Sequence, residues 1–145
     1  MTDQGVTEQG VTEPGAAVLI GASGPEAVPM YGLMVRWSLA DARPEAVQQL
    51  RDFVRTTSLT RFTGMAGLRF KTWRMVEGEW FEGTYVWASA EARDAFAAAD
   101  RAGMHDSPGT RIVGSAPVLH APFEVLAVAE GAEGFASGPG HGAST

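Results

Sequence analysis

The apolar residues between positions 30 and 57 follow first the period of a β-strand and then the period of a helix. Every second residue of 30–39 is apolar, which predicts a strand with one buried face (Tyr31, Leu33, Val35, Trp37 and Leu39). From 43 to 57 the apolar residues recur at helical spacing, which predicts an amphipathic helix (Val47, Leu50, Phe53, Val54 and Thr57). Asp41 and Pro44 are typical residues for the start of that helix.

A hairpin and a second helix follow. Residues 67–76 and 80–88 are rich in β-branched and aromatic residues, and Glu77-Gly78 between them suits a tight turn. Ser89 is a good N-cap for a helix over about 90–102, which ends at Gly103.

The last strand lies within 112–128, where apolar residues again alternate with more polar ones. Pro117 and Pro122 cannot donate to a sheet ladder, so at least the start of this strand belongs at an edge of the sheet. The predicted order is β-α-β-β-α-β, which is the α+β ferredoxin-like plan of one antiparallel sheet with two helices on one face.

The uncovered face of that sheet is expected to be an interface. A turn on Glu77-Gly78 predicts that Met75 faces Trp80, Trp73 faces Glu82 and Lys71 faces Thr84. The helix-packed face then holds Leu68, Phe70, Phe81, Tyr85 and Trp87, and the open face holds Arg69, Lys71, Trp73, Met75, Trp80 and Glu82. Two exposed tryptophans and a methionine would form a large apolar patch, so we expect two copies to close face to face as a homodimer.

Composition places the charge in the tails and excludes several classes of function. The 145 residues carry a net charge of −6, but five acidic residues and no basic one lie in the tails, which leaves 29–130 with 12 acids, 11 bases and a net charge of −1. We expect a flexible N-terminal arm over 1–28, one domain over 29–130 and a flexible Gly-rich tail over 131–145. The scattered bases disfavour nucleic acid as a partner. No apolar run is long enough to span a membrane and no signal peptide is evident, so we expect a cytoplasmic protein.

Metal and thiol chemistry find no support in the sequence. The chain has no cysteine, and its three histidines match no metal-binding spacing.

Two stretches resemble a known superfamily. The first stretch is Gly67-Leu68-Arg69-Phe70-Lys71-Thr72-Trp73. The second is Gly83-Thr84-Tyr85-Val86-Trp87, followed by Ala90-Glu91-Ala92-Arg93-Asp94-Ala95. They are similar to the dimeric α+β barrel superfamily, in particular to its YdhR-like candidate monooxygenases and the antibiotic-biosynthesis monooxygenases. The resemblance departs at Glu82-Gly83, where the family tends to have paired glycines, and over Met104–Gly109.

That resemblance implies a homodimer that oxidises an aromatic or polyketide-like small molecule with O2 and without a metal or organic cofactor. In such chemistry an electron-rich phenolate reduces O2 itself, and the protein supplies a dry pocket, a base and a stabilising charge.

The candidate site residues are assigned roles on that basis. Trp73, Tyr85 and Trp87 are expected to form aromatic walls for the ligand, together with Phe70. Lys71 or Arg74 is expected to stabilise an enolate or phenolate, and Glu82 or His105 to move the proton.

Each residue also has a plainer interpretation. Lys71 and Trp73 fit dimer-core packing, Tyr85 and Trp87 fit a plain core, Glu82 fits an ion pair with Lys71 or Arg69, and His105 fits a solvated loop. Two other functions stay open on the same fold: a cyclase or isomerase of a polyketide-like intermediate, and a non-catalytic ligand-binding accessory protein.

Overall fold

A computed structural model of the chain describes residues 28–136, and it contains a single four-stranded sheet in that range. The predicted arm over 1–28 lies almost wholly outside the described residues, as does the end of the predicted tail. The strands are β2 (Tyr31–Ser38), β3 (Leu68–Val76), β4 (Trp80–Trp87) and β5 (Leu119–Glu124). The main helices are α1 (Ala46–Phe53), α2 (Leu59–Phe62), α3 (Ala90–Gly103) and α4 (Pro108–Val113).

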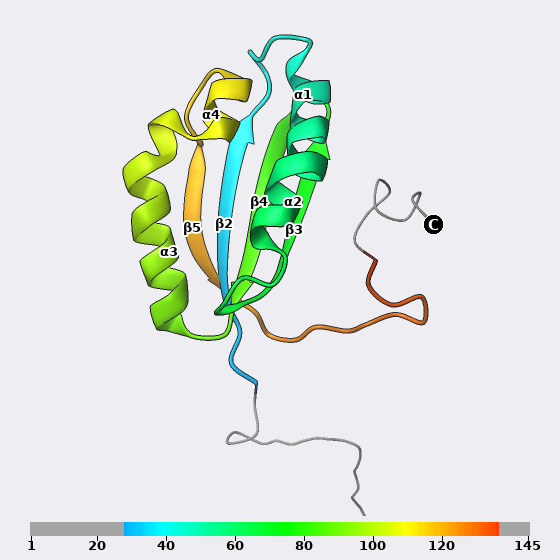
Figure 1. Ribbon diagram of the computed structural model, residues 1–145, viewed down its shortest axis with the longest axis vertical. Coiled ribbons are helices and arrows are strands. Elements are labelled where there is room, and N and C mark those ends of the chain that lie inside the picture. The colour runs from blue at the N-terminus through cyan, green and yellow to red at the C-terminus, as the bar shows by residue number, and fades with distance from the viewer. Residues whose placement is uncertain (1–27, 137–145) are drawn as a thin grey trace, which may run out of the picture.

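The sheet confirms the predicted ferredoxin-like fold. Its strand order is β3-β4-β2-β5, and all three pairings are antiparallel (Figure 1). β5 lies at an edge, as Pro117 and Pro122 predict, because an edge strand needs only one row of ladder hydrogen bonds. Among the helices of residues 28–136, none has the length and apolarity that a membrane crossing requires.

The first helical region is longer than predicted and changes its winding. α1 passes into a π-helical turn, η4 (Val54–Ser58), and then into α2, so the region ends at Phe62 rather than near residue 57. A π-turn adds a residue to the helical repeat and shifts the side chains that follow it. Phe62 is thereby buried at 5% exposure and belongs to the core.

The segment between α3 and β5 is also more structured than the sequence indicates. A 3-10 turn, η5 (Met104–Asp106), leads into α4, whose N-cap Ser107 accepts a hydrogen bond from the Thr110 backbone N–H. The Thr110 hydroxyl in turn accepts a hydrogen bond of 3.1 Å from the Trp37 indole N–H. Gly109 lets this helix approach closely, because a Cβ there would lie 2.9 Å from the Trp37 ring. α4 therefore caps one end of the core.

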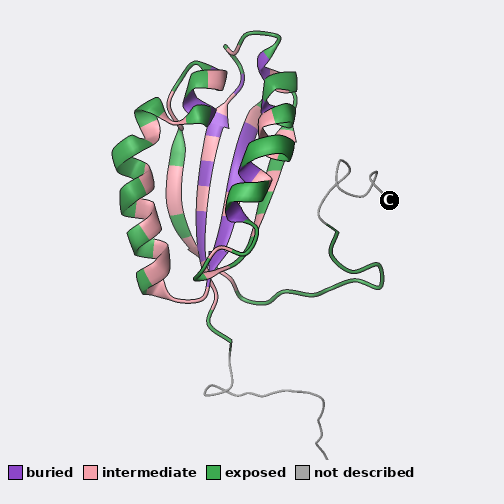
Figure 2. Cartoon of the chain, viewed as in Figure 1, coloured by how far each residue is buried: buried purple, intermediate pink, exposed green. Residues whose placement is uncertain are grey.

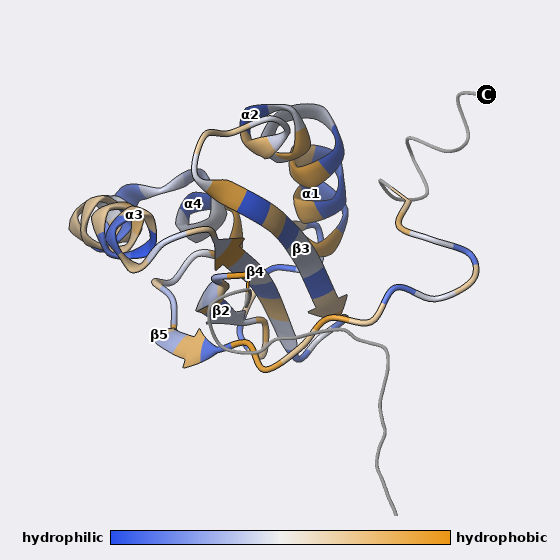
Figure 3. Cartoon of the chain, turned by 90° about the horizontal axis from the view of Figure 1, so that it is seen from below, coloured by the Kyte–Doolittle hydropathy of each residue, from blue (hydrophilic) through white to orange (hydrophobic). Residues whose placement is uncertain are grey.

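The core lies between the sheet and the helices. Buried residues concentrate on the central strands β2 and β4 (Figure 2). The helices α1 to α4 all lie on one side of the sheet, and the other side has no helical layer (Figure 3). We call the helix-covered side the inner face and the other side the outer face.

The predicted pairing of β3 with β4 is wrong by one residue. Lys71 pairs with Tyr85, Trp73 with Gly83 and Met75 with Phe81, so these three β3 residues lie on the inner face. The cause is the hairpin loop: Gly78, at φ +78°, lies in a three-residue connection that sets Val76 opposite Trp80.

A β-bulge at Arg69 shifts the strand again. Leu68 lies opposite Trp87 on the inner face as predicted, but Phe70 lies opposite Val86 on the outer face, where it is 36% exposed. The Arg69 side chain donates a hydrogen bond to the Pro29 carbonyl oxygen at 2.7 Å.

Candidate functional site

Two neighbouring pockets lie at the inner face, and the side chains of Phe62, Lys71 and Trp73 line both of them. The inner pocket, about 60 Å³, lies under the helices and is lined by Trp37, Phe53, Ser58, Arg61, Phe62, Lys71, Trp73, Phe81, Gly83, Tyr85, Asp100, Ser107, Pro108 and Gly109. The edge pocket, about 180 Å³, lies between α2 and β3 and is lined by Leu59, Phe62, Thr63, Gly64, Met65, Leu68, Arg69, Phe70, Lys71 and Trp73. The edge pocket exceeds the space of a few waters, so a small organic ligand fits against Lys71.

The Lys71 amine lies among aromatic rings. Its Nζ is 3.7 Å from the ring centre of Phe62, 4.2 Å from that of Tyr85 and 4.6 Å from that of Trp73. It donates one hydrogen bond, of 3.0 Å, to the Tyr85 hydroxyl oxygen. Within residues 28–136 no carboxylate forms an ion pair with it. Gly83 leaves room for the lysine stem, because a Cβ there would lie 3.2 Å from Lys71 Cε.

This environment lowers the pKa of Lys71 to about 6. Burial is the main cause, since a charged ammonium is poorly solvated there, and the positive charge of Arg61 adds to it. The carboxylate of Asp100 acts in the opposite direction but more weakly. At neutral pH the amine is therefore mostly uncharged, and its lone pair is available for a proton or an electrophile.

Tyr85 keeps its proton beside that amine. Burial, followed by the charge of Asp100, raises the pKa of the Tyr85 phenol. Its ring stacks on Trp87 with centres 6.2 Å apart and tilts against Phe96 at 4.8 Å. The hydroxyl is thus held in place as a neutral hydrogen-bond donor.

The π-helical turn positions Trp73. Ser58, at the end of η4, is buried and accepts a hydrogen bond of 3.0 Å from the Trp73 indole N–H. Without that hydroxyl a partly buried donor would lose its partner. The turn therefore connects the helix to the aromatic wall of the pocket.

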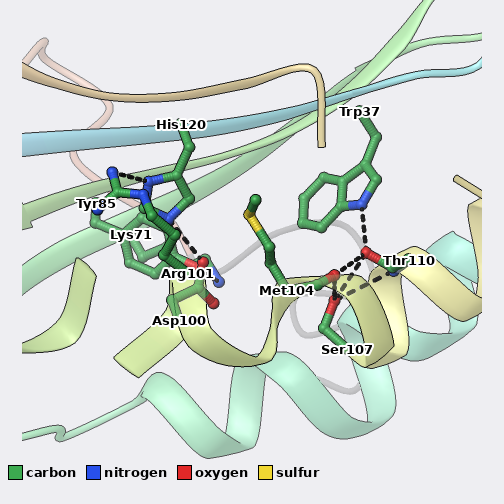
Figure 4. Close-up of polar contacts among 9 residues, drawn as sticks. All are labelled: Trp37, Lys71, Tyr85, Asp100, Arg101, Met104, Ser107, Thr110 and His120. Carbon is green, nitrogen blue, oxygen red and sulfur yellow. Dashed lines mark hydrogen bonds and ion pairs between the residues drawn. The ribbon is translucent and has the colours of Figure 1, made fainter. Parts of the chain in front are cut away.

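Asp100 is fixed by a histidine from the edge strand. His120 Nε2 lies 3.0 Å from Asp100 Oδ2, and Arg101 lies 2.9 Å from His120 Nδ1 (Figure 4). A guanidinium only donates, so Nδ1 accepts and Nε2 carries the proton that His120 donates to Asp100. The carboxylate in the inner pocket is thus oriented by a neutral imidazole.

The structure brings together only part of the predicted site. Lys71, Tyr85 and Trp73 meet in the inner pocket, and Trp87 lies behind the Tyr85 ring. Phe70 lines the edge pocket with its backbone on the outer-face side of the bulge.

The other three predicted residues lie apart from this cluster. Glu82 and Arg74 are on the outer face, where the fully buried Glu82 carboxylate forms ion pairs with Arg74 and, at 3.0 Å, with Arg36. The expected pairing of Glu82 with Lys71 or Arg69 is wrong, because the corrected register puts Arg74 opposite it. His105 is exposed on η5 and does not line either pocket; Ser107 and Pro108 of the same segment do.

Sequence reasoning missed three pocket residues, each with a readable signal. Asp100 continues the apolar stripe of Ala92 and Phe96 at four-residue intervals, so it is an acid on a core-facing helical position. Ser58 and Phe62 continue the helical spacing from Val54 in the same way. Within residues 28–136 no group of three or more His, Asp or Glu side chains is arranged to hold a metal ion.

Three solved structures are similar to this chain. The NE2512 protein of unknown function from Nitrosomonas europaea is 22% identical, with 72% of this chain and 97% of that chain covered and a TM-score of 0.49. A candidate antibiotic biosynthesis monooxygenase from Chloroflexus aurantiacus J-10-fl is 17% identical, with 69% of this chain and 96% of that chain covered and a TM-score of 0.41. Rv0793 from Mycobacterium tuberculosis is 18% identical, with 70% of this chain and 97% of that chain covered and a TM-score of 0.41. These are similarities of fold alone. No family model and no curated protein matches the chain.

Proposed function

We propose that the protein is a homodimeric oxygenase that oxidises an electron-rich aromatic or polyketide-like small molecule with O2 and without a cofactor. The observation that carries this proposal is the buried Lys71 amine, whose Nζ lies 3.7–4.6 Å from the ring centres of Phe62, Trp73 and Tyr85, and this burial lowers its pKa to about 6. A base with a pKa close to the working pH is well matched to removing a phenol proton.

Lys71 performs the proton step in this proposal. Its neutral amine takes the proton of a bound phenol or enol, and the resulting ammonium stays beside the anion that it has formed. Tyr85, still protonated, donates a hydrogen bond to the same anion. The Phe62 and Trp73 rings exclude water, which strengthens both interactions.

The anion then reacts with O2 directly. It transfers one electron to O2, and the two radicals join through a new C–O bond to give a peroxide anion. This anion takes back the proton held by Lys71, and the resulting hydroperoxide loses water to leave a carbonyl group. For an anthrone the balance is one anthrone and one O2 giving one anthraquinone and one water. The protein's part is to generate the anion in a dry site.

The outer face supports the dimer in this proposal. It exposes Phe70, Val76 and Leu119 at 36–40% of their surface and has no helical layer. Trp80 lies there too, with the Arg36 guanidinium 4.2 Å above its ring centre. Trp73, which the predicted register placed on this face, lies on the inner face instead, so the apolar patch is smaller than the sequence indicates.

Oxygen uptake with a hydroquinone or an anthrone tests the activity. In metal-free protein with chelator present, we expect uptake that matches quinone formed one to one, and a loss of at least about 100-fold in Lys71→Met, the usual scale for a lost general base. Arg55→Met, which removes a cation that is exposed on η4, is the matched control and should retain full activity.

Other outcomes contradict oxygenation. Substrate conversion that continues under argon indicates the cyclase or isomerase function. Bound ligand without conversion indicates an accessory binding protein.

A further inference from the structure

Lys71 is the only lysine of the chain: the other ten of its 11 basic residues are arginines. A guanidinium stays protonated in any protein environment, whereas an ammonium loses its proton readily on burial. The chain thus places its one side-chain amine where it can act as a nucleophile, and its arginines supply every other positive side chain. We propose that Lys71 captures a ligand aldehyde or ketone as an imine in the inner pocket.

The geometry around Lys71 suits attack on a carbonyl carbon. Nζ has no carboxylate ion pair within residues 28–136, so its lone pair is not held by an acidic partner. Its hydrogen bond to Tyr85 uses one N–H and leaves the phenolic proton free for the pocket. A carbonyl group beside both residues places its carbon at the amine and its oxygen at the phenol, which is the arrangement that addition requires.

The titratable and charged groups facing Lys71 come from three elements. Arg61 of α2 favours the neutral amine, Asp100 of α3 favours the ammonium, and Tyr85 of β4 is uncharged. Asp100 is also the pocket carboxylate that His120 orients. It is therefore the group available to receive and return protons during the condensation.

The reaction is a condensation and involves no oxidation. The amine nitrogen forms a bond to the carbonyl carbon, and the carbonyl oxygen takes a proton from Tyr85 to give a carbinolamine. Asp100 receives one proton from nitrogen and returns it to the hydroxyl group, which leaves as water. The C=N bond forms as water leaves, and the remaining proton on nitrogen goes to the Tyr85 phenolate, so that both residues end as they began.

This inference goes beyond the proposed oxygenation, because imine formation needs no O2. Acetaldehyde is a suitable probe, because the inner pocket of about 60 Å³ has room for a molecule of only a few heavy atoms. The full chain is incubated with acetaldehyde and cyanoborohydride at about pH 7, so that any imine is reduced to a stable ethylamine. Intact mass and peptide mapping then locate the label, and only Lys71 and the terminal amine of the chain can carry it.

The expected result is a Lys71 label that forms at least about tenfold faster in the folded chain than in the urea-unfolded chain, where the lysine returns to its ordinary pKa of 10.5. Its rate should fall with a midpoint near the Lys71 pKa of about 6 as the solution is acidified. Lys71 labelling that is slower in the folded chain than in the unfolded one would overturn the proposal.

Two variants separate chemistry from access. Tyr85→Phe keeps the lysine and removes the proton donor, so it should label several-fold more slowly while still labelling at Lys71. Lys71→Arg should leave only the terminal amine labelled. Equal labelling rates in wild type and Tyr85→Phe would show that Tyr85 is not the proton donor in imine formation. Oxygen uptake is measured separately, so the labelling results do not test the proposed oxygenase activity.

Discussion

At the residue scale, the buried Lys71 amine makes the stability of the fold depend on pH, in the same direction as a carboxyl group whose pKa is lowered by folding. Its pKa is about 6 in the folded chain, against an ordinary value of 10.5. Between these values the unfolded chain binds a proton that the folded chain does not, so the free energy of unfolding rises with pH. The penalty for burying the amine is complete below pH 6 and disappears above the unfolded pKa.

Lys71→Met tests this linkage. The variant has no proton to lose, so its stability relative to wild type should decline as pH rises. From about pH 6.5 to about pH 8.5 the difference in unfolding free energy should change by about 2–3 kcal/mol in favour of wild type. Urea denaturation of both chains measures it, and taking the difference cancels the titration of histidines and the terminus. A pH-independent difference would mean that Lys71 is charged in the folded chain.

Glu82 is the second residue whose role the structure redefines. Its carboxylate is fully buried on the outer face between Arg36 and Arg74, whose side chains are 32% and 54% exposed. Glu82→Gln should lower the unfolding free energy by about 1–3 kcal/mol, because both guanidinium groups lose the negative charge and one of them faces an amide NH2 donor in place of an acceptor. The matched control is Glu77→Gln at the exposed Arg51 pair, with an expected effect within about 0.5 kcal/mol. Equal effects in the two variants would show that the Glu82 cluster contributes no more than a surface pair.

At the element scale, the strands differ in how far their sequences determine their orientation. β2 and β4 each carry large apolar residues at alternate positions along the inner face, although β4 also has Trp80 on the outer face, so their inner faces could be predicted from alternation. β3 carries apolar residues in both phases: Leu68 and Phe70 in one, Trp73 and Met75 in the other. The bulge at Arg69 allows Leu68 and Trp73 to lie on the same face, and a strict period of two cannot represent that change.

The same limit explains which site residues could be predicted. Lys71, Trp73 and Tyr85 were identifiable by residue type and motif, but their meeting on the inner face depends on the hairpin register. Ser58 and Phe62 continue the four-residue spacing from Val54, but they lie beyond residue 57, where the predicted helix ends, and the π-turn continues the helical region to them. The sequence therefore predicts which residue types could act in the site. Which of them lie together depends on the hairpin register, the β-bulge at Arg69 and the π-helical turn, which the sequence pattern does not predict.

Gly32 of β2 leaves room for the Phe123 ring of β5, so we predict that a larger residue at this position destabilises the fold. A Cβ at Gly32 would lie 2.1 Å from a ring atom of Phe123 on the neighbouring strand, too close for any small adjustment. Gly32→Ala should lower the unfolding free energy by about 1–3 kcal/mol, the usual scale for overpacking. In a Phe123→Ala background the same change should cost much less, because the ring is gone. Urea denaturation of the four chains in this cycle gives the coupling, and purely additive effects would contradict the contact.

At the scale of the whole molecule, the two faces of the sheet have different roles. The inner face holds the core and the pocket under the helices, while the outer face combines apolar side chains with the Arg36–Glu82–Arg74 cluster. Beyond β5 the chain crosses to the opposite edge of the sheet, where Phe135 stacks on Phe70 with ring centres 6.4 Å apart. Phe135 is still 73% exposed, so this contact covers little of the outer face.

The proposed dimer predicts that one charge at the centre of the outer face separates the two copies. Met34 lies there, opposite Thr84 on one side and Ala121 on the other. Met34→Glu would place a carboxylate in the closed interface, where burial without a partner is costly, but would leave it in water in a monomer. Sedimentation velocity at micromolar concentration should therefore show a dimer for wild type and a folded monomer for Met34→Glu, with redder Trp80 emission. Ala99→Glu, at an exposed position of α3, should remain a dimer. A wild-type chain that sediments as a monomer would contradict the dimer, and a Met34→Glu chain that stays dimeric would place the interface elsewhere.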